Sequence, residues 1–206
     1  MPSSLENQMT FTDKLRHFFR TFLDNVGNGI HNLGIRADTI TLVGLIGNII
    51  AAVFIARGNL LVGGILLLCM GPLDAFDGAV ARAEGKSSKF GAFLDSVTDR
   101  YSELIILGGL LIYFLRLEDN TTVILTFVAA AGSVLVSYTR ARAEGIGYSV
   151  KAGLMTRVER YLVLVPGIIF NIPRISIWII ALMANFTAIQ RIWIVWKQSK
   201  MEEKEK

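Results

Sequence analysis

Residues 74–100, DAFDGAVARAEGKSSKFGAFLDSVTDR, place four aspartates between two long apolar segments of the chain. Asp74 and Asp77 are three residues apart, and Asp95 and Asp99 are four residues apart, so each pair occupies one face of a helix. A short connection makes the two helices antiparallel neighbours. At about 1.5 Å per residue, Asp77 and Asp95 should lie at similar depth, with Asp74 and Asp99 deeper. The spacing therefore predicts four carboxylates that converge between two helices.

The apolar residues on either side are gathered into segments with the length of membrane-spanning helices. The 206-residue chain is 52% hydrophobic, and its mean hydropathy is +0.50. A helix of roughly 20 apolar residues crosses a hydrocarbon layer about 30 Å thick. The six expected spans are residues 39–56, 60–80, 90–115, 122–138, 158–170 and 175–196. They leave no room for a separate soluble domain, so the sequence predicts an all-α integral membrane bundle of six transmembrane helices.

A seventh, interfacial helix is expected before the first span. Residues 11–30, FTDKLRHFFRTFLDNVGNGI, alternate apolar and basic positions with a helical period, as do amphipathic helices that lie in the headgroup plane. The predicted organisation is a cytoplasmic arm over residues 1–36, a membrane domain over 37–197 and a charged cytoplasmic tail over 198–206.

The basic residues predict the orientation of this bundle. Sixteen lysines and arginines fall in the terminal segments and the connections on one side, whereas only Arg57, Arg116 and Arg174 fall on the other. Positively charged connections stay on the cytoplasmic face, so both termini and the connection around residues 84–88 should face the cytoplasm. The net charge of +4 fits attraction to an anionic membrane surface. No nucleic-acid-binding motif is recognised in the sequence.

The four aspartates require compensating positive charge inside a membrane domain. Each ionised carboxylate costs about 2.5 kcal/mol even on the lowest insertion scale, and Arg82 and Arg100 could neutralise at most two. Divalent cations that prefer oxygen ligands suit such a site, so we expect Mg²⁺, with Mn²⁺ as an alternative. Two carboxylate pairs fit one or two ions, and such ions commonly hold phosphate oxygens.

Small residues accompany the acids. Gly78, Ala81 and Gly91 leave room for a bulky group to approach the helix backbones. Arg82 lies where a guanidinium could hold a diphosphate. Small residues also allow helices to pack closely, but their combination with four acids in register favours a binding site.

This set of residues carries a family resemblance. The set comprises Asp74, Asp77, Gly78, Ala81, Arg82, Gly91, Asp95 and Asp99. At these spacings it resembles the complete signature of the CDP-alcohol phosphotransferases, and the similarity extends over about residues 30–196. The resemblance implies a homodimeric membrane enzyme of phospholipid biosynthesis. Such an enzyme transfers a phosphatidyl-type group from a CDP-linked lipid to an alcohol and releases CMP.

The resemblance also implies roles for the individual residues. Asp74, Asp77 and Asp95 would be metal ligands, and Asp99 would be both a ligand and the general base for the attacking hydroxyl. The CDP moiety would be bordered by Gly78, Ala81, Arg82 and Gly91.

Arginines in later segments indicate that the acceptor alcohol itself carries a phosphate. They are Arg140, Arg142, Arg157, Arg160 and Arg191. Arg142 and Arg157 fit ordinary cytoplasmic anchors equally well, whereas Arg191 lies in the nearly uncharged stretch NFTAIQRIWIVW.

The same segments are similar to those of the phosphatidylinositol phosphate and archaetidylinositol phosphate synthases. SYTRARAEG, which begins at Ser137, matches their S-Y-x-K-A-R-A-E pattern except that Arg140 replaces the usual lysine. This similarity implies that Ser137, Arg140, Arg160 and Arg191 bind inositol 1-phosphate. Arginine keeps the charge but has a larger fork than lysine.

Three other functions fit the residues less well. Relatives that use glycerol 3-phosphate tend to have L-D-P where this chain has Leu94-Asp95-Ser96, which weighs against a phosphatidylglycerophosphate synthase. A prenyl-diphosphate transferase would place a second pair of aspartates on distant helices. A divalent-cation transporter would need polar groups across the membrane, and the external halves of the spans are nearly free of them. The sequence leaves the donor open between CDP-diacylglycerol and CDP-archaeol.

Overall fold

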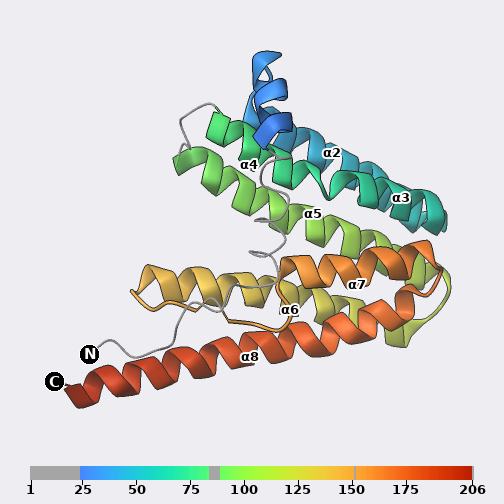
Figure 1. Ribbon diagram of the computed structural model, residues 1–206. Coiled ribbons are helices and arrows are strands. Elements are labelled where there is room, and N and C mark those ends of the chain that lie inside the picture. Colours follow the sequence, from blue (N-terminus) through green and yellow to red (C-terminus); the bar gives the residue numbers. More distant parts are fainter. Residues whose placement is uncertain (1–23, 84–88, 151, 206) are drawn as a thin grey trace.

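The computed structural model describes residues 24–83, 89–150 and 152–205, and these residues form helices with no strand among them (Figure 1). Residues 24–32 are helical. The helices that follow are α2 (Ala37–Ala56), α3 (Leu60–Met70), α4 (Leu73–Ala83), α5 (Lys89–Arg116), α6 (Asn120–Gly145), α7 (Arg157–Ile169) and α8 (Pro173–Glu205). The prediction of an all-α fold is confirmed. The predicted interfacial helix over residues 11–30 lies largely outside the described residues.

The helices run back and forth in two layers (Figure 1). One layer contains α2 to α5, and the other contains α6 to α8. Contacts of α5 with α6 and of α3 with α7 join the layers. Because the direction alternates, the C-terminal end of α4 and the N-terminal ends of α5 and α7 point toward the same end of the bundle. That end contains the stretch with the four aspartates.

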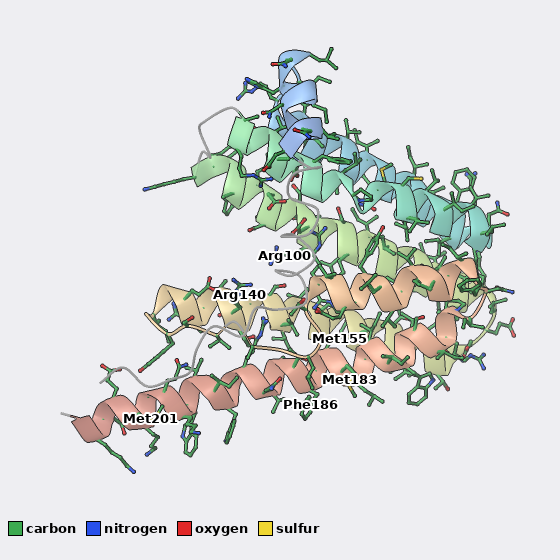
Figure 2. All side chains as sticks on the ribbon, in the orientation of Figure 1. Arg100, Arg140, Met155, Met183, Phe186 and Met201 are labelled. Carbon is green, nitrogen blue, oxygen red and sulfur yellow. The ribbon has the colours of Figure 1, made fainter. Side chains whose placement is uncertain are left out.

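Apolar side chains fill the inside of the bundle and also cover much of its outside. Ile55, Leu110 and Ile177 are completely buried between the helices. Large apolar side chains such as Phe127 and Phe186 are exposed, and Figure 2 shows Phe186 on the side of α8 that faces away from the other helices. Extended apolar surface is rare on soluble monomers and suits contact with lipid.

Three of the described helices are long and apolar enough to cross a membrane. They are α2, α6 and α8, the last over Pro173–Lys204. The structure therefore supports three of the six predicted spans directly. Charged residues along α5 and the 13-residue length of α7 keep these helices from meeting the same criterion.

The expected single span over residues 60–80 is wrong in one respect, since the structure divides it into α3 and α4 at Gly71 and Pro72. Proline has no N–H to donate to the preceding turn, and its ring crowds that turn. The Tyr161 hydroxyl of α7 donates to the Leu67 carbonyl beside the break. A Cβ added at Gly71 would lie 2.6 Å from the Tyr161 hydroxyl oxygen. Therefore α4 begins as a separate helix, and Tyr161 of α7 lies beside the break that precedes it.

At the end of the bundle opposite the four aspartates, one carboxylate joins the start of α6 to the start of α8. Asp119 caps α6, because it accepts hydrogen bonds from the backbone N–H and the hydroxyl of Thr122. Arg174 at the start of α8 lies 2.6 Å from the same carboxylate. The hydrogen bond from the Thr122 hydroxyl, together with the charge of Arg174, lowers the pKa of Asp119.

A close backbone approach between α2 and α5 predicts a large effect on stability. A Cβ added at Gly109 would lie 2.7 Å from the carbonyl oxygen of Ala52 and 3.1 Å from its Cα. We expect Gly109→Val to destabilise the fold by about 3 kcal/mol, since overpacking against backbone cannot be relieved by a side-chain rotation. Thermal unfolding of the detergent-solubilised protein measures the effect. Gly108→Val is the matched control, because nothing lies within 4 Å of its added Cβ. Equal destabilisation by both substitutions would contradict the prediction.

Candidate active site

Asp77 is a buried acid at the contact of α4 with α2. Its side chain is only 6% exposed, and its Oδ2 accepts a 2.8 Å hydrogen bond from the Thr41 hydroxyl. A buried carboxylate is stable when it is paired or coordinates a metal, so Asp77 is chemically suited to be a metal ligand.

Asp95 and Asp99 extend from α5 one helical turn apart. Asp95 is partly exposed, whereas the Asp99 side chain is 14% exposed and forms a 2.6 Å ion pair between its Oδ1 and Nη1 of Arg157. Arg100 approaches the other oxygen of Asp99 at 3.6 Å. The structure thus surrounds the predicted general base with positive charge from both α5 and α7.

The predicted four-aspartate site stays a prediction. The side chain of Asp74 lies outside the described part of the chain. Among the side chains that are described, no three acidic, histidine or cysteine groups lie close enough together to hold a metal ion. The donor set nevertheless fits a hard divalent cation, because its carboxylate oxygens come from α4 and α5, which both pack on α2, and one of the acids is buried.

The predicted CDP-binding residues lie near the helix of residues 24–32. The nearest atom to a Cβ added at Gly78 would be Nη1 of Arg82, 3.7 Å away, so this surface is open. Arg82 donates from Nε and Nη2 to Oδ1 of Asp24, at 3.1 and 2.7 Å. A Cβ at Gly27 would lie 2.7 Å from that of Ala79, so the helix of residues 24–32 packs closely on α4. Ala81 and Gly91 are partly exposed.

Arg160 of α7 is held in place by an acid that the sequence analysis missed. It is 2% exposed, and it donates from Nε and Nη2 to the two carboxylate oxygens of Glu103 at 2.5 and 2.8 Å. Its Nη1 donates to the Met155 carbonyl at 2.9 Å. Glu103 continues the four-residue row of Asp95 and Asp99 on α5, which is the sequence signal that could have identified it.

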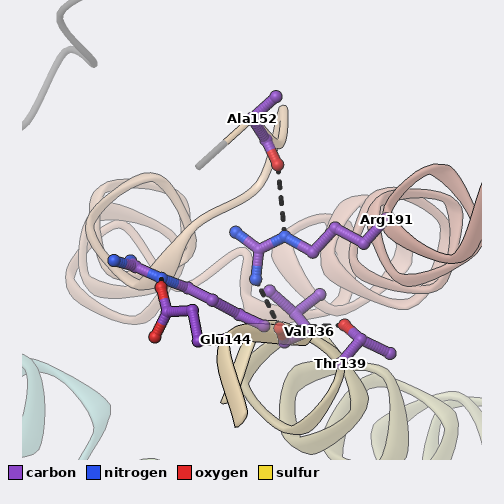
Figure 3. Close-up of polar contacts among 6 residues, drawn as sticks. Val136, Thr139, Glu144, Ala152 and Arg191 are labelled. Atoms are coloured by element: carbon purple, nitrogen blue, oxygen red, sulfur yellow. Dashed lines mark hydrogen bonds and ion pairs between the residues drawn. The ribbon is translucent and has the colours of Figure 1, made fainter. Parts of the chain in front are cut away.

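Arg191 of α8 is also 2% exposed and is bound differently (Figure 3). It donates from Nε to the Ala152 carbonyl at 3.2 Å and from Nη1 to the Val136 carbonyl. Arg140 and Arg160 are close enough for their charges to repel that of Arg191. Arg140 and Arg160 thus lie within electrostatic range of Arg191, whereas Ser137 is placed only by its position on α6, one residue after Val136.

Arg140 is the exposed member of this arginine group. Its Nε donates to Glu144 at 2.9 Å, one turn further along α6. Figure 2 places Arg140 and Arg100 on α6 and α5, one in each layer. Arg140 and Arg160 each bind a carboxylate, whereas the hydrogen bonds of Arg191 within the described chain are made to backbone carbonyls.

A small cavity of about 40 Å³ lies beside Arg160 and Glu103. Its polar lining is provided by Asn48, Ser102, Glu103, Arg157 and Arg160. The cavity borders both arginines of α7 and lies next to the break between α3 and α4, where Gly71 contributes to the lining. It is large enough for a few water molecules beneath the acidic residues.

Comparisons with known proteins place this arrangement in context. Residues 35–193 match the family model for CDP-alcohol phosphatidyltransferase. An archaetidylinositol phosphate synthase of Pyrococcus horikoshii is 36% identical over 189 residues, which cover 91% of this chain and 98% of the relative. A phosphatidylinositol phosphate synthase of Streptomyces avermitilis is 36% identical over 201 residues, with coverage of 89% and 82%.

Solved structures give the same picture. The crystal structure of Mycobacterium tuberculosis phosphatidylinositol phosphate synthase with CDP-DAG bound matches with a TM-score of 0.79 at 27% identity, over 84% of this chain and 93% of that one. The same synthase in complex with manganese and citrate also matches with a TM-score of 0.79 at 27% identity, over 84% and 88% of the two chains. The matched family region contains all of the predicted site residues.

Proposed function

Since the chain belongs to the CDP-alcohol phosphatidyltransferase family, which makes it an enzyme of phospholipid synthesis, we propose that its acceptor is inositol 1-phosphate. In the proposed reaction a phosphatidyl-type group passes from a CDP-linked lipid to the acceptor hydroxyl, and CMP is released. The names of the relatives support this assignment. The CDP-DAG bound to the similar mycobacterial enzyme supports the class of donor.

The buried guanidinium of Arg191 is the observation that favours an acceptor with a phosphate group over an uncharged one. Its hydrogen bonds in the described chain reach only neutral carbonyls, while Arg140 and Arg160 are bound to Glu144 and Glu103. A buried charge without a hydrogen-bonded counterion is unfavourable, and a phosphate monoester would supply that counterion through charge-assisted hydrogen bonds. An uncharged acceptor such as inositol would not.

The four aspartates are proposed to act on the diphosphate of the donor and on the attacking hydroxyl. Asp74, Asp77, Asp95 and Asp99 would hold Mg²⁺ or Mn²⁺, with room for two ions, and the manganese complex of the mycobacterial relative supports a divalent ion. When bound, such ions hold diphosphate oxygens and make CMP a better leaving group. Asp99 would also take the proton from the attacking hydroxyl, since a carboxylate within hydrogen-bond reach is a suitable base.

The donor site is proposed to lie beside α4. Gly78, Ala81 and Gly91 would allow the CDP moiety close to the backbone, and Arg82 would bind its diphosphate after leaving Asp24. The lipid tails would contact the apolar outer surface, which suits diacylglycerol and archaeol chains equally.

The membrane arrangement is part of the same proposal. Six spans, an interfacial helix over residues 11–30, and a homodimer would place the active site and both termini on the cytoplasmic side of the cell membrane. The three long apolar helices and the concentration of lysine and arginine in the connections of one side support this arrangement.

A CMP-release assay tests the proposed function. The purified protein would receive CDP-diacylglycerol or CDP-archaeol together with inositol 1-phosphate, glycerol 3-phosphate, serine or inositol, each with Mg²⁺ or with EDTA. We expect turnover with inositol 1-phosphate and Mg²⁺, and its loss in EDTA, because the carboxylates require the ion to bind the diphosphate. Preference for glycerol 3-phosphate would overturn the acceptor assignment and leave the family unchanged. Turnover that is indifferent to EDTA would overturn the metal site.

A further inference from the structure

We propose that Arg157 couples the acid site to the acceptor site. It would neutralise Asp99 while the metal is absent and bind the acceptor phosphate once the metal is present. This inference rests on the proposed function. Its starting point is the 2.6 Å ion pair between Nη1 of Arg157 and Oδ1 of Asp99, which joins α7 to a predicted metal ligand that is only 14% exposed.

A divalent ion and Arg157 compete for the same carboxylate. An ion coordinated by Asp99 would stand within a few ångströms of the guanidinium, and two cations at that distance repel each other strongly in a site shielded from water. Arg100 adds further positive charge, 3.6 Å from the second oxygen of Asp99. Metal binding therefore weakens the contact between Arg157 and Asp99.

The structure provides a destination for the displaced guanidinium. Arg157 is three residues before Arg160, and both arginines line the cavity that also contains Ser102 and Glu103. Arg160 is held by Glu103 and by the Met155 carbonyl. Arg157 is the first residue of α7, and 36% of its side chain is exposed, which leaves space beside it for a change of rotamer. An acceptor phosphate bound beside Arg160 would give the displaced guanidinium an anion to bind.

The consequence is a thermodynamic coupling between two ligands. If the metal frees Arg157 to bind the phosphate, the metal raises the affinity for the acceptor, and the acceptor raises the affinity for the metal by the same factor. Asp99 also remains paired with an arginine until the ion arrives, so the base becomes competent only when the donor site is complete.

Equilibrium binding tests this coupling without turnover. Binding of Mn²⁺ to the full chain in detergent would be measured by the loss of the free-ion electron paramagnetic resonance signal, with and without saturating inositol 1-phosphate and without CDP-lipid. We expect the acceptor to lower the Mn²⁺ dissociation constant of the wild-type protein about tenfold. In Arg157→Gln, Mn²⁺ should bind more tightly in the absence of acceptor, and the acceptor should change the constant less than about twofold.

Arg100→Gln is the matched control. Arg100 also contacts Asp99, but its Nη1 donates to the Ser96 carbonyl of its own helix at 2.6 Å. Its removal should strengthen Mn²⁺ binding and leave the coupling intact. Arg157→Lys, which keeps the charge in case the glutamine variant does not fold, should retain part of the coupling.

Equal coupling in the wild-type protein and in Arg157→Gln would overturn the inference, and so would weaker Mn²⁺ binding by Arg157→Gln. Loss of coupling in Arg100→Gln would also overturn it, because removal of either arginine beside Asp99 would then have the same effect. The proposed function fails separately, if wild-type protein releases no CMP with inositol 1-phosphate.

Discussion

Asp99→Asn is expected to lower the rate of CMP release at least about 10³-fold while the protein still folds. General-base catalysis alone contributes about 10²- to 10⁴-fold, and the substitution also removes a predicted metal ligand. The amide has nearly the shape of the carboxylate, but it neither accepts the hydroxyl proton nor carries the charge that attracts the ion. The rate would be measured with CDP-diacylglycerol, inositol 1-phosphate and saturating Mg²⁺, and the thermal unfolding midpoint would report folding.

Asp119→Asn controls for the loss of a carboxylate paired with arginine. Asp119 pairs with Arg174 at the opposite end of the bundle, so the same chemical change there should leave CMP release within about twofold of wild type and reduce stability slightly. An Asp99→Asn protein that keeps more than about a tenth of the wild-type rate would refute the assignment of Asp99 as the base.

Arg191→Gln is expected to raise the KM for inositol 1-phosphate about 100-fold and to change the KM for the CDP-lipid little. Truncating one partner of a buried, hydrogen-bonded charge pair costs about 2–5 kcal/mol, and about 2.7 kcal/mol corresponds to 100-fold. Glutamine can still donate toward the Val136 or Ala152 carbonyl, so the helices should remain packed. Arg191→Lys keeps the charge without the planar fork, so its KM for inositol 1-phosphate should lie between those of the wild-type protein and Arg191→Gln.

Arg142→Gln is the matched control for this second substitution. Arg142 is exposed on α6, and the sequence allowed either an anchoring or an acceptor-binding role for it. The charges that act on Arg191 are those of Arg140, Arg160 and Glu144 rather than that of Arg142, which favours an anchor, so the KM for inositol 1-phosphate should change less than about twofold. A comparable rise in both variants would mean that general positive charge, rather than the buried guanidinium, attracts the acceptor.

Helical periodicity predicted the fold class and several sets of residues that share one face of a helix. The three- and four-residue spacings correctly place Asp95 and Asp99 along α5, and the same row leads to Glu103. The prediction stopped at Asp99 because the signature of residues and spacings that carries the resemblance ends there. The gathering of Arg140, Arg160 and Arg191 was expected from the resemblance, whereas periodicity alone could not reveal it, since it gives no distance between helices.

Contacts between segments far apart in the chain could not be predicted from the sequence. The pairs Arg82 with Asp24 and Arg157 with Asp99 depend on how helices far apart in the chain pack, and each arginine had several possible acidic partners. Pro72 was visible, but it lies in an apolar run long enough to be interpreted as one span. Whether a proline bends or divides a helix depends on the groups that pack beside it, here Tyr161 of α7.

The position of Tyr161 gives α7 an additional importance. Within one turn of this helix, Arg160 binds α5 through Glu103, and Tyr161 binds the end of α3 next to the start of α4. One helix thus contacts both α5, which carries Asp95 and Asp99, and the end of α3 that leads into α4. A shift of α7 by even a fraction of an ångström would move both the Arg160 guanidinium, which is proposed to bind the acceptor, and the end of α3 that leads into α4. Substitutions on its outer face, far from either proposed substrate pocket, should therefore alter the affinities for both substrates at once.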